Sequence, residues 1–155
     1  MSYEDPRTIQ SILHRAKTIA IVGLSPNELR ASHFVGYYLR RHGYTVIPVN
    51  PREQSILGAR SYASLAEIPE RIDVVDVFRT PDAVPAIAEE AVAAGVGALW
   101  LQYGVISPEG AEIATRGGVD VVMDRCMKVE HARYLGRMHW LGFNTGEITS
   151  SRSHG

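Results

Sequence analysis

Four side chains that could do chemistry lie close together in the segment "DRCMKVEH", residues 124–131. They are Asp124, Cys126, Glu130 and His131, and a thiolate near an imidazole can act as a nucleophile. A cysteine and a histidine can also bind zinc, but zinc needs three or four ligands and the chain has a single cysteine. We therefore expect no metal site and keep Cys126 and His131 as secondary candidates for catalysis, because single buried cysteines are usually inert packing residues.

A second stretch, "KTIAIVGLSPNELRASHF", indicates binding of an anion. Its apolar run ends at a glycine, which lets backbone approach a ligand, but the further glycines of a dinucleotide-binding loop are missing. A serine hydroxyl, an arginine and the start of a helix follow, and together they suit a pyrophosphate. A plain strand-to-helix turn is the alternative. The candidate residues are Gly23, Leu24, Ser25, Pro26, Arg30 and Ser32.

The segment "VNPRE" distinguishes between cofactors. A classical NAD site carries Asp or Glu at the end of the second strand, where it binds the ribose hydroxyls. Here Asn50, Pro51 and Arg52 occupy that place, and Glu53 follows a proline that turns the chain away. Arg52 suits a phosphate on the adenosine ribose, at the 2′ position in NADP or the 3′ position in coenzyme A; a solvated loop arginine is the alternative.

Two further loops, "FRTPDAVP" and "LQYGVISPEG", complete the candidate site. In the first, an arginine adds positive charge and Thr80 with Pro81 is expected to cap the next helix. In the second, Gln102 and Gly104 can offer amide groups to a ligand that crosses the sheet edge. The candidate residues of the two loops are Phe78, Arg79, Thr80, Pro81, Val84, Gln102, Tyr103 and Gly104.

The elements that must position these loops alternate between strand-like and helix-like patterns. Apolar runs typical of strands buried on both faces cover 18–22, 45–49, 73–78, 98–102 and 119–123, with a short extended piece near "RSYAS". Helical patterns begin at Asp5-Pro6, cover about 31–42, begin at Thr80-Pro81 and Ser107-Pro108, and run from about Val129 to Met138. In the 31–42 helix the expected buried stripe is Phe34, Val35, Tyr38 and Leu39.

This alternation predicts an α/β fold: a Rossmann-like three-layer αβα domain with a mainly parallel sheet of five or six strands. We place the 73–78 strand beside the first strand. Ligands in such sheets bind beyond the carboxyl ends of the strands. That rule selects five loops, at 23–30, 50–53, 79–82, 102–107 and 124–128. The domain is expected to cover 1–143, followed by a disordered tail at 144–155 without hydrophobic periodicity.

Composition limits the classes of partner. The chain has 155 residues, a net charge of −1 and a pI of about 6.6, so no overall positive charge attracts it to nucleic acid or anionic lipid. No apolar run reaches the roughly 18 residues of a membrane span. The single cysteine fits a reducing compartment, and the first residues do not read as a signal peptide. We expect a cytoplasmic protein, with Met127, Met138 and Trp140 in the core or on a homodimer face.

Taken together, "IVGLSPNELRASHFVGYYLRRHGYTVIPVNP", "DVVDVFRTPDAVP", "LWLQYGV" and "VMDRCMKVEHARY" resemble the small stand-alone CoA-binding proteins. Their fold is similar to the N-terminal domain of the succinyl-CoA ligase α subunit. The resemblance covers roughly residues 5–140 and implies that coenzyme A or a short acyl-CoA lies across the strand ends. It implies contacts from 23–26, from the basic position at Arg52, from 78–81 with Val84, and from 102–104.

The resemblance also implies a limit. The ligases carry a phosphorylated histidine in a later domain, which this sequence does not contain, so binding is expected rather than turnover. Two other functions stay open: an NADP-binding oxidoreductase fragment, which would also explain Arg52, and a non-catalytic partner subunit of an acyl-CoA enzyme. Cys126 could also meet the pantetheine thiol in a mixed disulfide.

Overall fold

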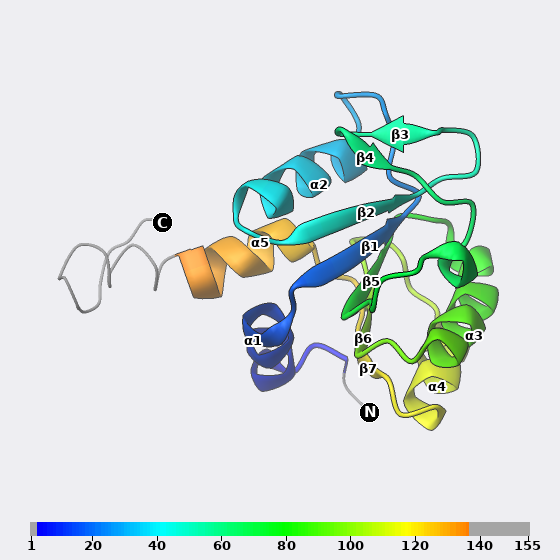
Figure 1. The fold of residues 1–155 in the computed structure, drawn as a ribbon. Helices are drawn as coiled ribbons and strands as arrows, with labels where there is room; N and C mark the ends of the chain where they lie inside the picture. Colours follow the sequence, from blue (N-terminus) through cyan, green and yellow to red (C-terminus); the bar gives the residue numbers. More distant parts are fainter. Residues whose placement is uncertain (1–2, 137–155) are drawn as a thin grey trace, which may run out of the picture.

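The computed structural model of the chain describes residues 3–136, which form a parallel β-sheet covered by helices on both faces (Figure 1). The sheet contains β1 (Thr18–Val22), β2 (Thr45–Val49), β5 (Val74–Val77), β6 (Ala98–Leu101) and β7 (Asp120–Val122), and a separate hairpin contains β3 (Ser55–Ile56) and β4 (Ala59–Arg60). The helices are α1 (Pro6–Arg15), α2 (Ala31–Arg41), α3 (Val84–Ala94), α4 (Pro108–Arg116) and α5 (Met127–His131).

The strand order is β2-β1-β5-β6-β7, and every neighbouring pair is parallel. The expected placement of the 73–78 strand beside the first strand is confirmed, with Ile19 opposite both Val46 and Val74. Helices α2, α3 and α4 form the crossovers from β1 to β2, from β5 to β6 and from β6 to β7, whereas the β2-to-β5 crossover carries the β3–β4 hairpin and a short 3₁₀ turn, Leu65–Glu67; α1 precedes the sheet and α5 follows it. The carboxyl ends of all five strands therefore meet at one edge, as the sequence predicts.

The helices divide between the two faces of the sheet. Figure 1 shows α1, α2 and α5 on one face and α3 and α4 on the other. Two helix caps expected from sequence are formed: the Asp5 carboxylate accepts from the backbone N–H of Arg7, and the Ser107 hydroxyl accepts from that of Gly110. The helices at these two caps begin with proline at the first helical position, where no N–H is required.

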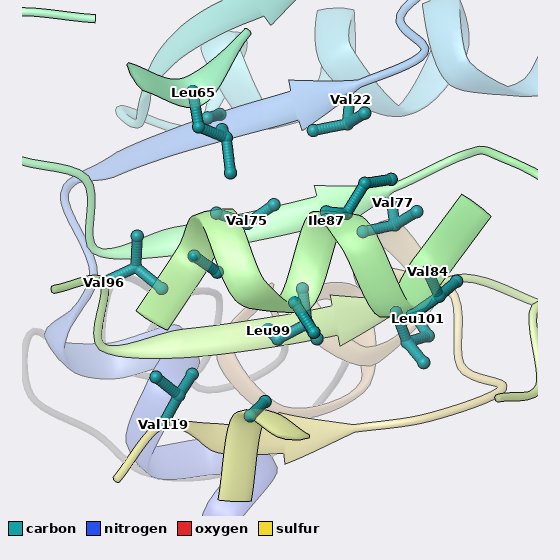
Figure 2. Close-up of a cluster of buried hydrophobic side chains, with 14 of the residues drawn as sticks. Val22, Leu65, Val75, Val77, Val84, Ile87, Val96, Leu99, Leu101 and Val119 are labelled. Atoms are coloured by element: carbon teal, nitrogen blue, oxygen red, sulfur yellow. The ribbon is translucent and has the colours of Figure 1, made fainter. Parts of the chain in front are cut away.

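The face under α3 and α4 is filled by aliphatic side chains (Figure 2). Strand residues at alternate positions point into it, among them Val75, Val77, Leu99 and Leu101, and all four are completely buried. Helix α3 meets α4 closely, because a Cβ on Gly110 would lie 2.4 Å from a methyl carbon of Val84. This face holds the α3 and α4 layer to the sheet.

The opposite face, under α1, α2 and α5, contains Trp100, Cys126 and Met127 beside aliphatic side chains. It also contains Asp76, whose neighbours across the sheet are Ile21 and Trp100. Asp76 is completely buried, and neither of its carboxyl oxygens has a hydrogen-bond partner among the described residues. Burial raises the pKa of the Asp76 carboxyl well above its ordinary value.

Two expectations about the elements are wrong in detail, and one strand was not expected. The last helix begins at Met127 rather than near Val129, and a π-helical turn, Ala132–Gly136, continues it. Phe34, expected in the buried stripe of the second helix, is 56% exposed, whereas Val35 and Leu39 are buried. The extended piece near "RSYAS" is preceded by a strand that sequence patterns did not indicate, and β3 and β4 form a hairpin. Strands two residues long are too short for a hydrophobic period to reveal.

The domain boundary expected at 143, the tail at 144–155 and the roles expected for Met138 and Trp140 all lie outside the described residues. Among residues 3–136, no helix is long and apolar enough to cross a membrane.

Candidate functional site

The loop after β1 is held tightly against the loop after β5. Gly23 has a φ of +90°, a left-handed value that favours glycine. A Cβ at this position would lie 2.7 Å from the backbone oxygen of Phe78 and 3.2 Å from Cδ of Arg79. The backbone N–H of Gly23 donates to the carbonyl of Val49 at 2.9 Å, which also ties this loop to β2. Gly23 therefore joins three of the predicted loops.

The hydroxyls of the first loop are engaged in building the loop itself. The backbone N–H of Ser25 donates to Oγ of Ser32 at 2.9 Å, and the N–H of Asn27 donates to Oγ of Ser25 at 3.0 Å. His33 Nδ1 lies 2.9 Å from the carbonyl oxygen of Ser25. Both serine oxygens thus serve as backbone caps, although each hydroxyl still has a hydrogen to donate. Leu24 is completely buried, while Pro26 is exposed.

The second loop is held in place by Asn50. Its Nδ2 donates to the carbonyl of Leu24 at 3.0 Å, and its Oδ1 accepts from the N–H of Arg52 at 2.9 Å. Asn50 therefore positions the loop rather than presenting its side chain to solvent. The Arg52 side chain is exposed and has no hydrogen bond or ion pair within residues 3–136, and the same is true of the Arg30 side chain.

A hollow beside the second loop includes a residue that the sequence did not suggest. It is lined by Asn50, Pro51, Glu53, Gln54, Arg60, Ser61, Ala63 and Glu67. The β3–β4 hairpin returns the chain to this place, and the Arg60 guanidinium carbon lies 5.0 Å from the centre of the Tyr62 ring. The two glutamates reduce the positive charge of this hollow. Only a prediction of the hairpin could have placed Arg60 here.

The third loop presents charge, but its expected helix cap is not formed. Thr80 precedes a short 3₁₀ turn, Pro81–Ala83, and its side chain makes no cap hydrogen bond; α3 begins only at Val84. The Thr80 hydroxyl instead lowers the pKa of the Asp82 carboxyl, helped by the backbone N–H of Asp82 and by Arg79. The Arg79 side chain is exposed, Phe78 is half-buried and Val84 is completely buried.

The loops after β6 and β7 use their polar groups on each other. Oε1 of Gln102 accepts from the N–H of Met127 at 3.0 Å, and the N–H of Gly104 donates to Oδ1 of Asp124 at 2.8 Å. Gly104 and Asp124 both have positive φ values, +79° and +62°. These two amide groups were expected to serve a ligand, and the structure uses both internally. Of the three candidate residues in this loop, Tyr103 stays accessible to a ligand, with 58% of its surface exposed.

The two secondary catalytic candidates, Cys126 and His131, are both buried and have different neighbours. Cys126 is the N-cap residue of α5 with extended backbone, so it does not share a helical face with Glu130; its carbonyl accepts from the Glu130 N–H at 3.0 Å. His131 turns toward α2, where its Nδ1 lies 2.9 Å from the Tyr38 hydroxyl. Within residues 3–136 no three histidine, cysteine or acidic side chains gather to hold a metal ion.

The fold and this edge define a Rossmann-like α/β domain whose loops after β1, β2 and β5 interlock and carry exposed arginines. A family model described as "CoA binding domain" matches residues 17–132, and the chain belongs to this family. The chain is 41% identical over 124 residues to the protein YneT of Bacillus subtilis, covering 80% of this chain and 92% of that protein.

Longer and experimentally solved relatives share the same region. The ADP-forming acetate–CoA ligase I of Archaeoglobus fulgidus is 30% identical over 121 residues, which cover 72% of this chain and 18% of the ligase. A solved structure of a hypothetical protein from Pyrococcus horikoshii has a TM-score of 0.83 and 40% identity, covering 85% of this chain and 93% of that one. The family resemblance and the Rossmann-like fold expected from sequence are both confirmed.

Proposed function

We propose that the chain binds coenzyme A, or a short acyl-CoA, along the carboxyl edge of its sheet. One observation carries the proposal: Gly23 and Asn50 fix three neighbouring loops together, and these loops expose Arg30, Arg52 and Arg79. Guanidinium groups bind phosphates through paired N–H donors. Coenzyme A carries a pyrophosphate and a 3′-phosphate, so a ligand of this class can use all three cations.

The donor set fits such a ligand. Gly23 has no side chain to obstruct a pyrophosphate, and the start of α2 adds the positive end of its helix dipole beside Arg30. Arg52 follows β2, where a phosphate on the adenosine ribose would lie in a Rossmann-like site. The loop after β6 exposes Tyr103 and Ile106, while the Gln102 side-chain oxygen and the Gly104 N–H are already paired with the loop after β7. That surface suits the pantetheine arm.

We propose binding without ligation. The matched region is 18% of the length of the acetate–CoA ligase relative, so most of that enzyme has no counterpart in the described domain. The side chains that could supply a nucleophile, Cys126 and His131, are buried. Coenzyme A therefore enters as a bound ligand, held by phosphate contacts, and another protein would supply any reaction at its thiol.

Calorimetric titration with coenzyme A, dephospho-CoA and NADPH tests the proposal. Coenzyme A should bind saturably, and Arg52→Ala should weaken it by about tenfold or more, as loss of a hydrogen bond to a charged group does. Dephospho-CoA, which lacks the 3′-phosphate, should bind equally to both proteins. Arg116→Ala, at the far end of α4, is the matched control and should change neither affinity.

Three outcomes would contradict parts of this assignment. Absence of saturable coenzyme A binding at millimolar concentration rules out the function itself. Equal losses for coenzyme A and dephospho-CoA in Arg52→Ala would show that Arg52 does not read the 3′-phosphate. Tighter binding of NADPH than of coenzyme A would favour the NADP alternative, because Arg52 suits either ribose phosphate.

A pair of glycine variants tests the interlocked loops. Gly23→Ala should lower the free energy of unfolding by about 1–3 kcal/mol and weaken coenzyme A, because the new methyl group would press on the Phe78 carbonyl. Gly43 has a similar φ of +97° but no atom within 4 Å of an added Cβ. Gly43→Ala should therefore cost about 1 kcal/mol and leave binding unchanged. Equal affinity of the two variants for coenzyme A would show that Gly23 is not part of the binding site.

A further inference from the structure

The outer face of α2 presents a stripe of aromatic and cationic side chains. Arg30, the residue before the helix, is followed by Phe34, Tyr37 and Arg41 at helical spacing, so the four lie in one row. We call this row the α2 stripe. Phe34 and Tyr37 are 56% and 50% exposed, and Leu29, in the preceding loop, is 84% exposed. The row is about 16 Å long at the rise of an α-helix.

Half of the large hydrophobic side chains exposed within the described residues lie on this stripe or in the loop just before it. Six large hydrophobic residues are exposed within residues 3–136, and three of them are Leu29, Phe34 and Tyr37. A fourth, Val129, lies on α5, which runs beside α2 (Figure 1). Scattered exposed hydrophobic residues are ordinary, but a group on one face marks an interaction surface.

The charges around the stripe are positive. Helix α2 contains no acidic residue, and Lys128 of α5 reaches over it, with Nζ 5.2 Å from the centre of the Tyr38 ring. Arg41 donates to the Tyr37 hydroxyl at 3.0 Å, which holds the aromatic ring and the cation together. Arg30 has no side-chain partner within residues 3–136. One acid, Glu28, lies in the loop before the helix.

A second copy of the chain does not fit this surface. If a two-fold axis brought two stripes together antiparallel, Arg30 of one copy would face Arg41 of the other. In a parallel arrangement each arginine would face its own counterpart. Like charges would meet in either case, and α2 has no carboxylate to separate them. The occupant must therefore bring the negative charge itself.

We propose that the α2 stripe docks a polypeptide segment of another protein that carries aliphatic side chains flanked by carboxylates. Arginine, tyrosine and phenylalanine are enriched in the centres of protein interfaces, where they contribute most of the binding energy. An anionic membrane is less suited, because the chain has a net charge of −1 and the stripe offers little apolar area for insertion. Arg30, at the start of α2, is shared with the proposed coenzyme A site, whereas Phe34, Tyr37 and Arg41 lie along the outside of the helix.

A designed probe tests the surface on the full chain. The probe is a helical peptide of about 20 residues with leucines on one face and glutamates beside them, and its counterpart carries lysines in place of the glutamates. Fluorescence anisotropy should show saturable binding of the glutamate peptide and no saturable binding of the lysine peptide. Phe34→Ser and Arg41→Glu should each weaken binding about tenfold or more. Arg116→Glu, on α4, makes a matched charge change and should have little effect.

Each other outcome would overturn the proposal. No saturable binding of the glutamate peptide, or equal binding by the variants, would show that the α2 stripe is not a docking surface for acidic segments. A dimer in sedimentation experiments that Phe34→Ser dissociates would assign the stripe to self-association. Binding to phosphatidylglycerol-containing vesicles that Phe34→Ser abolishes would assign it to a membrane. Coenzyme A binding, measured on the same variants, should stay unchanged, so a failure here is separate from a failure of the ligand site.

Discussion

The two faces of the sheet use the same strands in different ways. On the face toward α3 and α4, the buried strand residues are aliphatic, as at Val75 and Leu99. On the face toward α1, α2 and α5, the same strands contribute Asp76 and Trp100. Burying a carboxyl group without a partner is unfavourable. Both faces therefore gain stability from buried apolar side chains, but the second also bears the cost of a buried carboxyl group without a partner among the described residues.

Other buried polar groups lie on the face toward α1, α2 and α5, which we call the mixed face. Glu130 is 1% exposed and pairs with Arg133 at 3.2 Å. His131 contacts the ring of Tyr38 and that of Tyr44, and burial raises the pKa of the Tyr44 phenol to about 12, with a smaller effect from Tyr38. The Tyr44 hydroxyl donates to the carbonyl of Leu13 at 2.6 Å. This face also carries α2, with its exposed stripe.

The largest expected effect comes from a substitution in the aliphatic core on the face toward α3 and α4. Leu99→Ala removes a completely buried side chain from a close-packed core and should lower the free energy of unfolding by about 2–5 kcal/mol. Phe34→Ala, on the exposed α2 stripe, should change it by about 0.5 kcal/mol or less. Urea titration of both variants gives the comparison. A loss near 1 kcal/mol for Leu99→Ala would mean that the core under α3 collapses into the space left behind.

The sequence predicts the sheet well because long apolar runs, punctuated by Gly and Pro, leave few alternatives. The alternation of strands and helices predicts the parallel order, and a Rossmann-like topology, as the most economical arrangement, predicts the position of β5 beside β1. Phe34 is the instructive failure. A helical period shows which residues share a stripe, but an aromatic at the stripe's edge can point either way until tertiary contacts decide. The β3–β4 hairpin is too short to leave any period.

For the candidate site, the sequence names the loops but does not show which polar groups the fold already uses. Asn50 and Gly104 look available in the sequence, yet each completes a hydrogen bond to a neighbouring loop. Those bonds depend on how separate strands are placed, which local patterns do not encode. Asp76 is read as part of an apolar run, and only the register shows that its carboxyl lies without a partner inside the described fold.

The pH dependence of stability should sharpen the contrast between the faces. The pKa of Asp76 is raised in the folded state, so its stabilising contribution is complete below the ordinary pKa of an aspartate and is lost as pH rises through the raised value. Between the ordinary and the raised pKa, the Asp76 carboxyl has lost its proton in the unfolded chain but still holds it in the native chain. The free energy of unfolding should therefore fall by about 1.4 kcal/mol per pH unit from this group.

Asp76→Asn isolates this effect, since asparagine has nearly the same shape and does not titrate. Urea titrations between about pH 5 and 8 should show a smaller decline with pH in the variant than in the parent protein. The difference between the two curves reports on Asp76, because all other titrating groups are shared. Parallel curves over this range would show that the Asp76 carboxyl has a partner in solution, such as a buried water molecule.

The smallest expected effect compares two ion pairs. In the first, Arg133 pairs with a buried carboxylate, Glu130, and in the second, Arg116 pairs with an exposed one, Glu112. Arg133→Ala leaves the buried Glu130 carboxylate without its cation and should lower the free energy of unfolding by about 1–2 kcal/mol. Arg116→Ala removes the partner of Glu112 on α4, a pair in which both side chains are mostly exposed, and should cost about 0.5 kcal/mol or less. Adding Glu130→Gln to Arg133→Ala should recover part of the first loss, because the amide needs no counter-charge. If urea titration showed equal losses in the free energy of unfolding for the two arginine variants, water would have to reach the Glu130 carboxylate in the folded protein.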